Sequence, residues 1–275
     1  MQKPVEKIMP QEDLRKMQLI QLDILVEFDR VCRKNNIRYI MEGGTLLGAV
    51  RHKAFIPWDD DIDVRMLRDD YEKFCEIADK ELAGNVYFQN CRNDKNYPWI
   101  YSKLRMNGTR AVRLGQEKMG MRDGVFIDVF PCDGIPDDPQ LLKKHSRQAM
   151  ICRKILYARA ARYSADTRVK RAFWRIVSLI PKSVAYKNAR KLTKQYTEQN
   201  CSRIGCIGWH ESFDVIGFEK RYFTELTELE FEGHMFLAPK DWDGFLRATY
   251  GDDYMTPPPP DKRGARSPLS DYDLG

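Results

Sequence analysis

The clearest pattern in the sequence is an amphipathic stretch near its beginning. From Gln11 to Lys34, apolar residues recur close to the spacing of one helical face, and the pattern fades at Asn35. We therefore predict a helix over this range. Residues 37–41 are apolar and β-prone, which predicts a short strand that runs into Gly43. A helix from Thr45 to His52 is expected to follow, with Thr45 near its start.

Further strands and helices alternate up to residue 136. Residues 61–66 alternate acidic and apolar side chains, as a strand with one exposed face does, and residues 69–82 have a helical pattern. Three more short strands are expected at 86–89, 101–105 and 125–130, the last ending at Pro131. The alternation predicts an α/β (α+β) fold in which helices flank a mixed sheet, with residues 1–136 as its core.

The character of the chain changes after residue 136. Residues 137–164, 167–179 and 184–200 predict three helices, with Pro181 between the last two. Residues 137–200 contain 16 Lys and Arg against 4 Asp and Glu, a net charge of +12, while the whole chain has +6. This basic helical insert indicates an anionic partner, although solvated helix faces explain it as well. Residues 201–275 are expected to return to the core and to end in a proline-rich tail.

Composition narrows the class of protein. The 275 residues are 43% apolar and 31% charged, enough for a packed core. There is no run of about eighteen apolar residues and no apolar secretory leader, which predicts neither a transmembrane helix nor secretion. Seven cysteines without regular spacing favour reduced thiols. We therefore expect a cytoplasmic protein.

Acidic residues gather in residues 59–63. On a strand, Asp61 and Asp63 share one face, and two carboxylates that project together repel each other unless a cation lies between them. Hard oxygen ligands favour Mg²⁺ or Mn²⁺. The alternatives are a solvated acidic edge and an EF-hand loop. The EF-hand needs glycine where Val64 stands, and the strand-like alternation disfavours it.

Two further features add to the acidic strand. Asp128 lies in the middle of an apolar strand, where burial is costly unless a shared metal or backbone donors provide a partner. Upstream, Gly43 and Gly44 lie between a strand and a helix, where the backbone can approach a phosphate at the helix N-terminus. A glycine pair alone more often marks a turn, so its weight comes from the acidic strand that follows.

These motifs together carry a resemblance. Residues 41–52 read MEGGTLLGAVRH, residues 56–64 read IPWDDDIDV, residues 127–134 read IDVFPCDG, and residues 250–255 read YGDDYM. The order of strand, glycine pair, Asp-x-Asp strand and later acid resembles the nucleotidyltransferase superfold. The full motifs are similar to the LicD family, which includes bacterial phosphocholine transferases and is related to fukutin and fukutin-related protein.

The resemblance implies a metal-assisted phosphotransferase. It would move a phospho-alcohol, typically phosphocholine, from a CDP-linked donor to a hydroxyl of a cell-surface glycan, such as lipopolysaccharide or teichoic acid, or of its lipid-linked precursor. Asp61, Asp63 and Asp128 would hold Mg²⁺ or Mn²⁺, and Asp128 would accept the proton of the attacking hydroxyl. The residues expected to bind substrate are Gly43, Gly44, Thr45, Arg51, His52, Lys103, Tyr250 and Asp252.

Two other functions are consistent with the same sequence features. The same fold could transfer a nucleotidyl group from an NTP, and a non-catalytic glycan-binding protein would use only the basic insert. Nucleic acid is disfavoured because no recognition module is present. Cys201, Cys206 and His210 offer three zinc ligands without a clear fourth.

Two further features of the sequence, a set of aromatic residues and a segment of mixed basic and apolar residues, point to binding surfaces. The aromatic residues available for a choline ammonium group are Trp58, Tyr97, Trp99 and Trp209. The segment from Arg168 to Ile180 mixes basic and apolar residues, as does a helix that lies on an anionic membrane. An ordinary core-facing helix with a basic outer face has the same composition.

Overall fold

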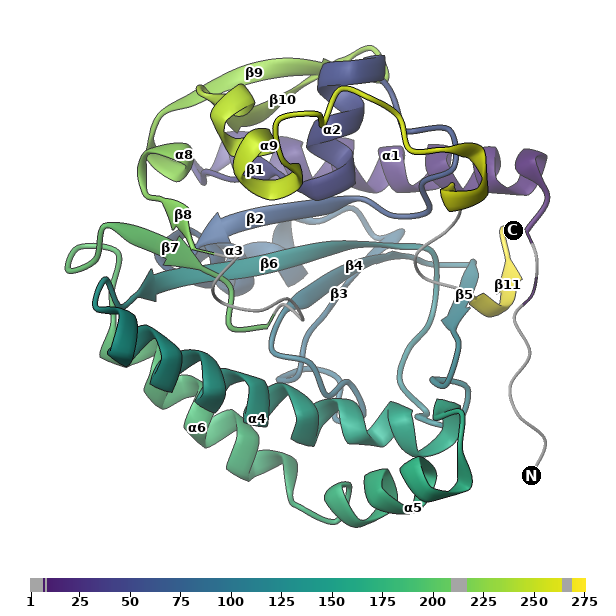
Figure 1. Ribbon diagram of the computed structural model, residues 1–275. Coiled ribbons are helices and arrows are strands. Elements are labelled where there is room, and N and C mark those ends of the chain that lie inside the picture. The colour runs from purple at the N-terminus through teal and green to yellow at the C-terminus, as the bar shows by residue number, and fades with distance from the viewer. Residues whose placement is uncertain (1–6, 8, 209–216, 264–268) are drawn as a thin grey trace.

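The protein is built around one curled, mixed sheet with helices on both sides (Figure 1). The computed structural model describes residues 7, 9–208, 217–263 and 269–275. The main sheet has seven strands in the order β1-β2-β6-β4-β3, with β7 and β8 continuing from the far end of β6. Its strands are β1 Ile40–Met41, β2 Asp63–Leu67, β3 Val86–Gln89, β4 Ser102–Met106, β6 Phe126–Ile135, β7 Arg203–Gly205 and β8 Phe218–Glu219. The predicted α+β class is confirmed.

Strand β6 is the central element of the sheet. It runs parallel to β2 and antiparallel to β4 and β7. Contrary to the prediction, β6 does not end at Pro131. The pairing with β4 stops at Val129 and the pairing with β7 starts at Asp133, so that Pro131, which has no N–H to donate, falls between two partners on that side.

Three helices pack against the sheet: α1 Gln11–Lys34, α2 Gly43–His52 and α3 Arg68–Glu81. In the view of Figure 1, α1 and α2 lie above the sheet and α3 lies behind it. The predicted bounds of α1 are confirmed, and its apolar face is buried in the main core, where the Phe28 ring packs edge-on against Tyr39 and Phe74. Helix α2 begins at Gly43 rather than at Thr45.

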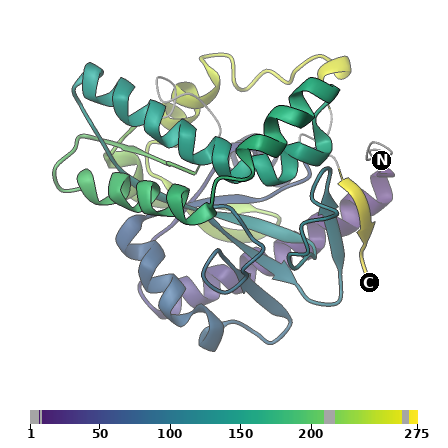
Figure 2. The same ribbon diagram turned by 90° about the horizontal axis from the view of Figure 1, so that it is seen from below.

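The basic insert forms three helices below the sheet in Figure 1, and Figure 2, which looks from below, shows them nearest the viewer. They are α4 Pro139–Ser164, α5 Arg168–Val177 and α6 Lys182–Gln195. Asp138 and Thr167 cap the first two helices by accepting hydrogen bonds from backbone N–H groups. Among the helices that the structure describes, none combines the length and the apolar composition that crossing a bilayer requires.

The remaining elements return to the core. They are α8 Arg221–Thr224, the hairpin β9 Leu226–Phe231 and β10 His234–Pro239, α9 Trp242–Tyr250, the short 3-10 helix Pro260–Lys262, and β11 Leu269–Asp273. Strand β11 pairs with β5, Arg110–Arg113. The segment expected to be only a stiff tail therefore ends in a paired strand, which a short pattern without local partners does not predict.

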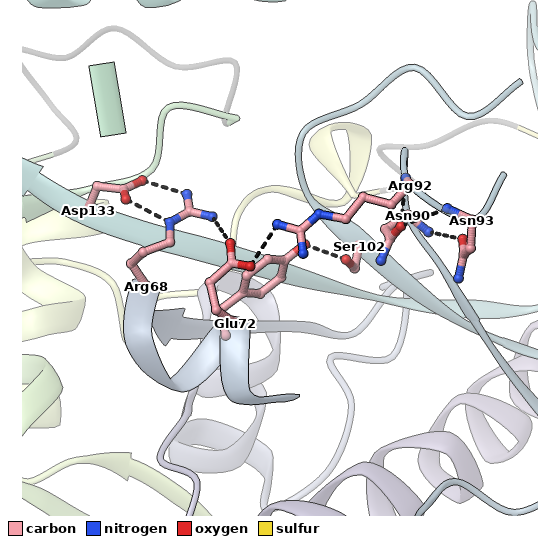
Figure 3. A network of polar contacts seen from close by, with 8 residues as sticks. Arg68, Glu72, Asn90, Arg92, Asn93, Ser102 and Asp133 are labelled. Carbon is pink, nitrogen blue, oxygen red and sulfur yellow. Dashed lines mark hydrogen bonds and ion pairs between the residues drawn. The ribbon is translucent and has the colours of Figure 1, made fainter. Parts of the chain in front are cut away.

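A polar network fastens α3 to the end of β6 (Figure 3). Arg68 donates to both carboxylate oxygens of Asp133 at 2.8 Å, and Glu72 lies between Arg68 and Arg92 at 3.4 and 2.7 Å. Tyr71 beside Arg68 shares a hydrogen bond with Ser102 of β4. Bidentate pairs of this kind are among the stronger charged contacts.

Candidate active site

Three charged residues form a row across the sheet. Asp63 of β2 lies beside Asp128 of β6, and Asp128 lies opposite Lys103 of β4. Residues paired in this way project from the same face. All three side chains are buried, and Lys103 forms a close ion pair with Asp128. From the sequence, Asp63 and Asp128 are expected to share a metal; the register places them on neighbouring strands and adds a lysine beside Asp128.

Arg113 joins this row from outside the main sheet. It belongs to β5, and its Nη2 lies 3.4 Å from Asp61 Oδ2 and 3.6 Å from Asp128 Oδ2. Its guanidinium also lies 4.7 Å from the centre of the Phe126 ring. Sequence analysis missed Arg113, because nothing in the pattern around it connects β5 to the acidic strand.

Asp61 does not lie on β2, which begins two residues later. It belongs to a loop in which one carboxylate oxygen each from Asp59, Asp60 and Asp61 lies within 4.8 Å of the others. Two glutamines of α1 hold this loop. Gln18 donates to the carbonyl of Asp59, and Gln21 donates to the carbonyl of Asp60, each at 2.9 Å. Two buried glutamines on an otherwise apolar helix face are the signal in the sequence for this contact.

The turn between β1 and α2 is tied to Asp63. Gly43 has φ +54°, and a Cβ there would lie 3.9 Å from Asp63 Oδ2. The Thr45 hydroxyl accepts a 3.0 Å hydrogen bond from the backbone N–H of Asp63. At Gly44, a Cβ would collide with the carboxylate of Asp59 at 2.1 Å. The two glycines thus let the N-terminus of α2 approach the acids, and their expected role in binding phosphate stays a prediction.

A buried ion pair supports the same turn from behind. Glu42, the residue before α2, accepts a 2.6 Å hydrogen bond from Arg65 of β2. The Arg65 guanidinium also lies 5.2 Å from the centre of the Phe218 ring. This pair fixes the β1–α2 turn to the strand that carries Asp63.

The surroundings of Asp61 and Asp63 disfavour the ionised form of both carboxyl groups. Burial, followed by the charge of Asp60, raises the pKa of Asp61 to about 6. Burial and the charges of Asp61 and Asp128 raise the pKa of Asp63 well above its ordinary value. Burial also lowers the pKa of Lys103 to about 7, although Asp128 opposes that change. A site that resists negative charge in this way suits a bound cation.

The residues present fit a hard divalent ion. Carboxylate oxygens from Asp61, Asp63 and Asp128 are the ligand type that Mg²⁺ and Mn²⁺ prefer. Their common role in binding the metal stays a prediction. One part of the sequence argument is corrected: Asp128 is compensated by Lys103 and Arg113, so its burial alone does not require a metal.

Two other metal hypotheses gain no support. Strand β2 begins at Asp63 and includes Val64, which is incompatible with an EF-hand loop over these residues. Cys201 and Cys206 are buried free thiols. His210, the third zinc candidate, and Trp209 lie outside the described residues.

The other predicted site residues fall into two groups. Tyr250 lies at the site, since its hydroxyl is 3.6 Å from the position of a Cβ on Gly43. Arg51 donates to His52 Nε2 at 3.0 Å and to the carbonyl of Tyr254 at 3.2 Å. Burial, then the charge of Arg51, lowers the pKa of His52. Asp252 is exposed and pairs with Arg247 at 3.0 Å, so no contact in the structure joins it to the acids.

Aromatic rings line the neighbouring part of the sheet. Tyr97, Trp99 and Tyr101 form a cluster with ring centres 5.2–6.4 Å apart. Tyr101 is 5.5 Å from Lys103 Nζ, measured to the ring centre. Trp58 is not part of this cluster. It precedes Asp59 of the acidic loop, and the guanidinium of Arg263 lies 4.7 Å from its ring centre. Of the aromatic candidates in the described residues, Tyr97 and Trp99 are the ones that belong to the cluster beside the charged row.

Comparison with known proteins shows the family of this chain. Residues 36–157 match the LicD/FKTN/FKRP nucleotidyltransferase domain family. A lipopolysaccharide cholinephosphotransferase LicD of Haemophilus influenzae is 32% identical over 263 residues, which cover 91% of this chain and 94% of that protein. The chain belongs to the LicD family.

A second group of relatives matches a shorter part. The ribitol 5-phosphate transferases FKRP of Homo sapiens and Mus musculus are each 46% identical over 50 residues, which are 18% of this chain and 10% of FKRP. Membership in the LicD family supports an enzyme that transfers phosphorus-containing groups.

Proposed function

We propose that this LicD family protein transfers a phospho-alcohol from a CDP-linked donor to a glycan hydroxyl, and that the group transferred is phosphocholine. The observation that carries the proposal is the likeness to a cholinephosphotransferase over 91% of the chain, together with an intact row of acids at the β2–β6 pair. Buried acids on two neighbouring strands, Asp63 and Asp128, have no evident use in a protein that only binds glycans, which disfavours the non-catalytic alternative.

The site residues would divide the chemistry of phosphoryl transfer. Asp61, Asp63 and Asp128 would hold Mg²⁺ or Mn²⁺, which supplies positive charge against the diphosphate of the donor. The N-terminus of α2 at Gly43 and Gly44, together with Arg113, would bind the phosphate oxygens.

The acceptor side of the reaction would depend on Asp128. Asp128 Oδ2 would take the proton of the attacking hydroxyl, while Lys103 holds Oδ1 and fixes the orientation of the carboxylate. Trp99 and Tyr101, which are half-buried, would offer ring faces to a quaternary ammonium group, and the fully buried Tyr97 packs against both rings.

We further propose that the acceptor is a cell-surface glycan or its lipid-linked precursor, modified on the cytoplasmic side of the membrane. The support is again the relative from Haemophilus influenzae, whose name refers to lipopolysaccharide. An acceptor that is still attached to a lipid carrier would be presented at a membrane surface.

The decisive experiment compares donors and products. Purified protein is incubated with CDP-choline, CDP-ribitol, CDP-glycerol, CTP or ATP, with glycan acceptor, and with Mg²⁺, Mn²⁺ or EDTA. We expect metal-dependent release of CMP from one CDP-alcohol. Release of pyrophosphate from an NTP would instead establish the nucleotidyltransferase alternative, and no release from any donor would contradict both.

A further inference from the structure

Helix α5 exposes its apolar face. None of its ten residues, all of which the structure describes, is buried. Its apolar side chains at Val169, Phe173 and Ile176 are 80%, 55% and 68% exposed, and Leu179 just beyond the helix is 79% exposed. Their spacing of four, three and three residues places them along one side of the helix. The alternative of an ordinary core-facing helix with a basic outer face is not supported, because this apolar row faces solvent.

Basic residues accompany the apolar row. Arg168, Lys170, Arg171 and Arg175 belong to the same helix, which contains no acidic residue. Asp166 before the helix pairs with Lys170 at 3.1 Å. The helix is part of the insert whose net charge is +12. An apolar row flanked by cations is the chemical pattern of a helix that lies in the interface of an anionic bilayer.

Neighbouring aromatic residues fix α5 to the insert. Trp174, on the inner side of α5, packs edge-on against Tyr157 of α4 with ring centres 5.8 Å apart, and against Phe173 at 5.1 Å. Trp174 thus packs against α4, whereas the apolar row of Val169, Phe173 and Ile176 faces solvent. Figure 2 looks onto this layer of helices from outside. Exposed apolar rows are unusual on a protein surface unless they bind something.

The same helix layer contacts the loop that follows β5, the strand that carries Arg113. Gly115 follows Arg113 by two residues, and a Cβ on Gly115 would lie 2.6 Å from Cβ of Ser164, the last residue of α4. The turn from α4 into α5 therefore abuts the loop that follows the strand of Arg113.

We propose that the α5 surface, formed by Val169, Phe173, Ile176, Leu179 and Ile180 with its flanking basic residues, binds peripherally to an anionic lipid bilayer. A second copy of the chain is a poorer occupant, because two inserts of charge +12 would repel each other. The apolar row would enter the acyl boundary, and the basic residues would contact lipid phosphates. This inference concerns a surface outside the site, and it stands or falls independently of the proposed donor.

The test is sedimentation of the full chain with vesicles. We compare vesicles of phosphatidylcholine alone with vesicles that also contain phosphatidylglycerol, at low and at high salt. Binding is expected for the anionic vesicles and is expected to weaken at high salt, because screening reduces the attraction of the basic residues. The double variant Phe173→Glu, Ile176→Glu should lose at least about tenfold in lipid affinity, because two apolar side chains no longer enter the interface.

The controls separate this effect from a fold defect. Met235→Glu changes a 49% exposed apolar residue on β10, away from the insert, and is expected to bind vesicles like the parent chain. Circular dichroism and the melting temperature should be unchanged in both variants, and CMP release from a free donor should be equal.

Three results would overturn the proposal. One is that the parent protein stays in the supernatant with anionic vesicles at low salt. The other is that light scattering reports a dimer that Phe173→Glu, Ile176→Glu dissociates, since the apolar row would then be a contact between copies. Vesicle binding that survives in the double variant would equally remove α5 from the explanation.

Discussion

Strand β6 carries two acids, Asp128 and Asp133, each buried within a group of charged residues, and the two groups differ in the balance of their charges. Near its beginning, Asp128 meets Asp63 and Asp61, and the cations that contact this group are Lys103 and Arg113. Near its end, Asp133 meets Arg68, and Glu72 and Arg92 complete two pairs of opposite charge. Both groups connect elements that are distant in the sequence, and only the second is balanced.

The pKa directions express the same difference. Burial would lower the pKa of Arg68, but Asp133 outweighs burial and the pKa is raised, so the pair keeps its charges. In the Asp63 group, burial and like charges raise the pKa of both Asp61 and Asp63. Balanced charges stabilise a fold, whereas an excess of one sign is retained where a ligand supplies the other.

The largest expected effect comes from the unbalanced group. Asp63→Asn should reduce CMP release about a thousandfold, equivalent to about 4 kcal/mol, because a metal ligand is lost. The melting temperature of the metal-free protein should stay equal or rise, since one of three neighbouring negative charges is removed. Titration with Mn²⁺ and steady-state kinetics measure the two effects.

The matched control for that variant is Asp69→Asn, which removes one negative charge from an exposed position at the start of α3. Its activity should stay within about twofold of the parent, because surface charges away from a site contribute little. Near-normal activity of Asp63→Asn would show that Asp63 does not bind the metal.

The balanced group should respond in the opposite way. Asp133→Asn should lower the free energy of unfolding by about 2–3 kcal/mol while kcat and KM change little. The cost is below the ~3–5 kcal/mol of a fully buried pair, because the Arg68 side chain is 28% exposed. Urea unfolding measures it, with Glu72→Gln as the milder control at about 1 kcal/mol or less. An inactive Asp133→Asn variant of unchanged stability would abolish the distinction between the two groups.

The pH dependence of stability offers a third comparison. The pKa of Asp61 is raised from 3.8 to about 6 in the folded state. The folded chain therefore holds its proton more tightly, and the contribution of Asp61 to stability falls as pH rises from 3.8 to about 6. Asp61→Asn removes the titrating carboxyl group, and with it the fall in stability between pH 3.8 and about 6. In EDTA, the variant should be about 2 kcal/mol more stable than the parent near pH ~7.5 and about equal near pH ~4.

The magnitude follows from the shift and from exposure. The change in pKa corresponds to ~3 kcal/mol, and the Asp61 side chain is 22% exposed, which reduces the expected effect. Denaturant unfolding at several pH values gives the curve. A stability difference that is constant with pH would mean that Asp61 is not the titrating group.

The smallest expected effect is that of Arg113. Arg113→Met should raise KM for the donor about tenfold and change kcat less, because the guanidinium binds phosphate and is not a metal ligand. Arg92→Met removes an arginine from the balanced group and should leave KM unchanged. Equal KM in both variants would remove Arg113 from the donor site.

The sequence predicted elements whose signal is local. Helix α1 was placed at its observed bounds because apolar spacing within one segment decides it. Asp63 and Asp128 are site candidates for a related reason: Asp63 lies in an acidic and apolar alternation and Asp128 interrupts an apolar strand, although neither pattern predicts that the two strands pair.

The missing parts depend on long-range contacts. Arg113 resembles any arginine on a short strand, and its place beside Asp61 arises only after β5 pairs with β11. Similarly, Gln18 and Gln21 are polar interruptions of a helix until the loop of Asp59 and Asp60 folds over them. Single-sequence patterns do not encode such pairings, because they join residues that share no local periodicity.

The pairing of β5 with β11 has a consequence for synthesis of the protein. Ser270 of β11 donates to the carbonyl of Val112, a residue 158 positions earlier in the chain. While the ribosome is still making the insert, β5 lacks this neighbour and presents an open edge. Arg113 therefore gains its support late, and a nascent chain can fold its sheet before the site is assembled. Ribosome stalling before residue 269 should leave a folded intermediate that is sensitive to proteases at β5.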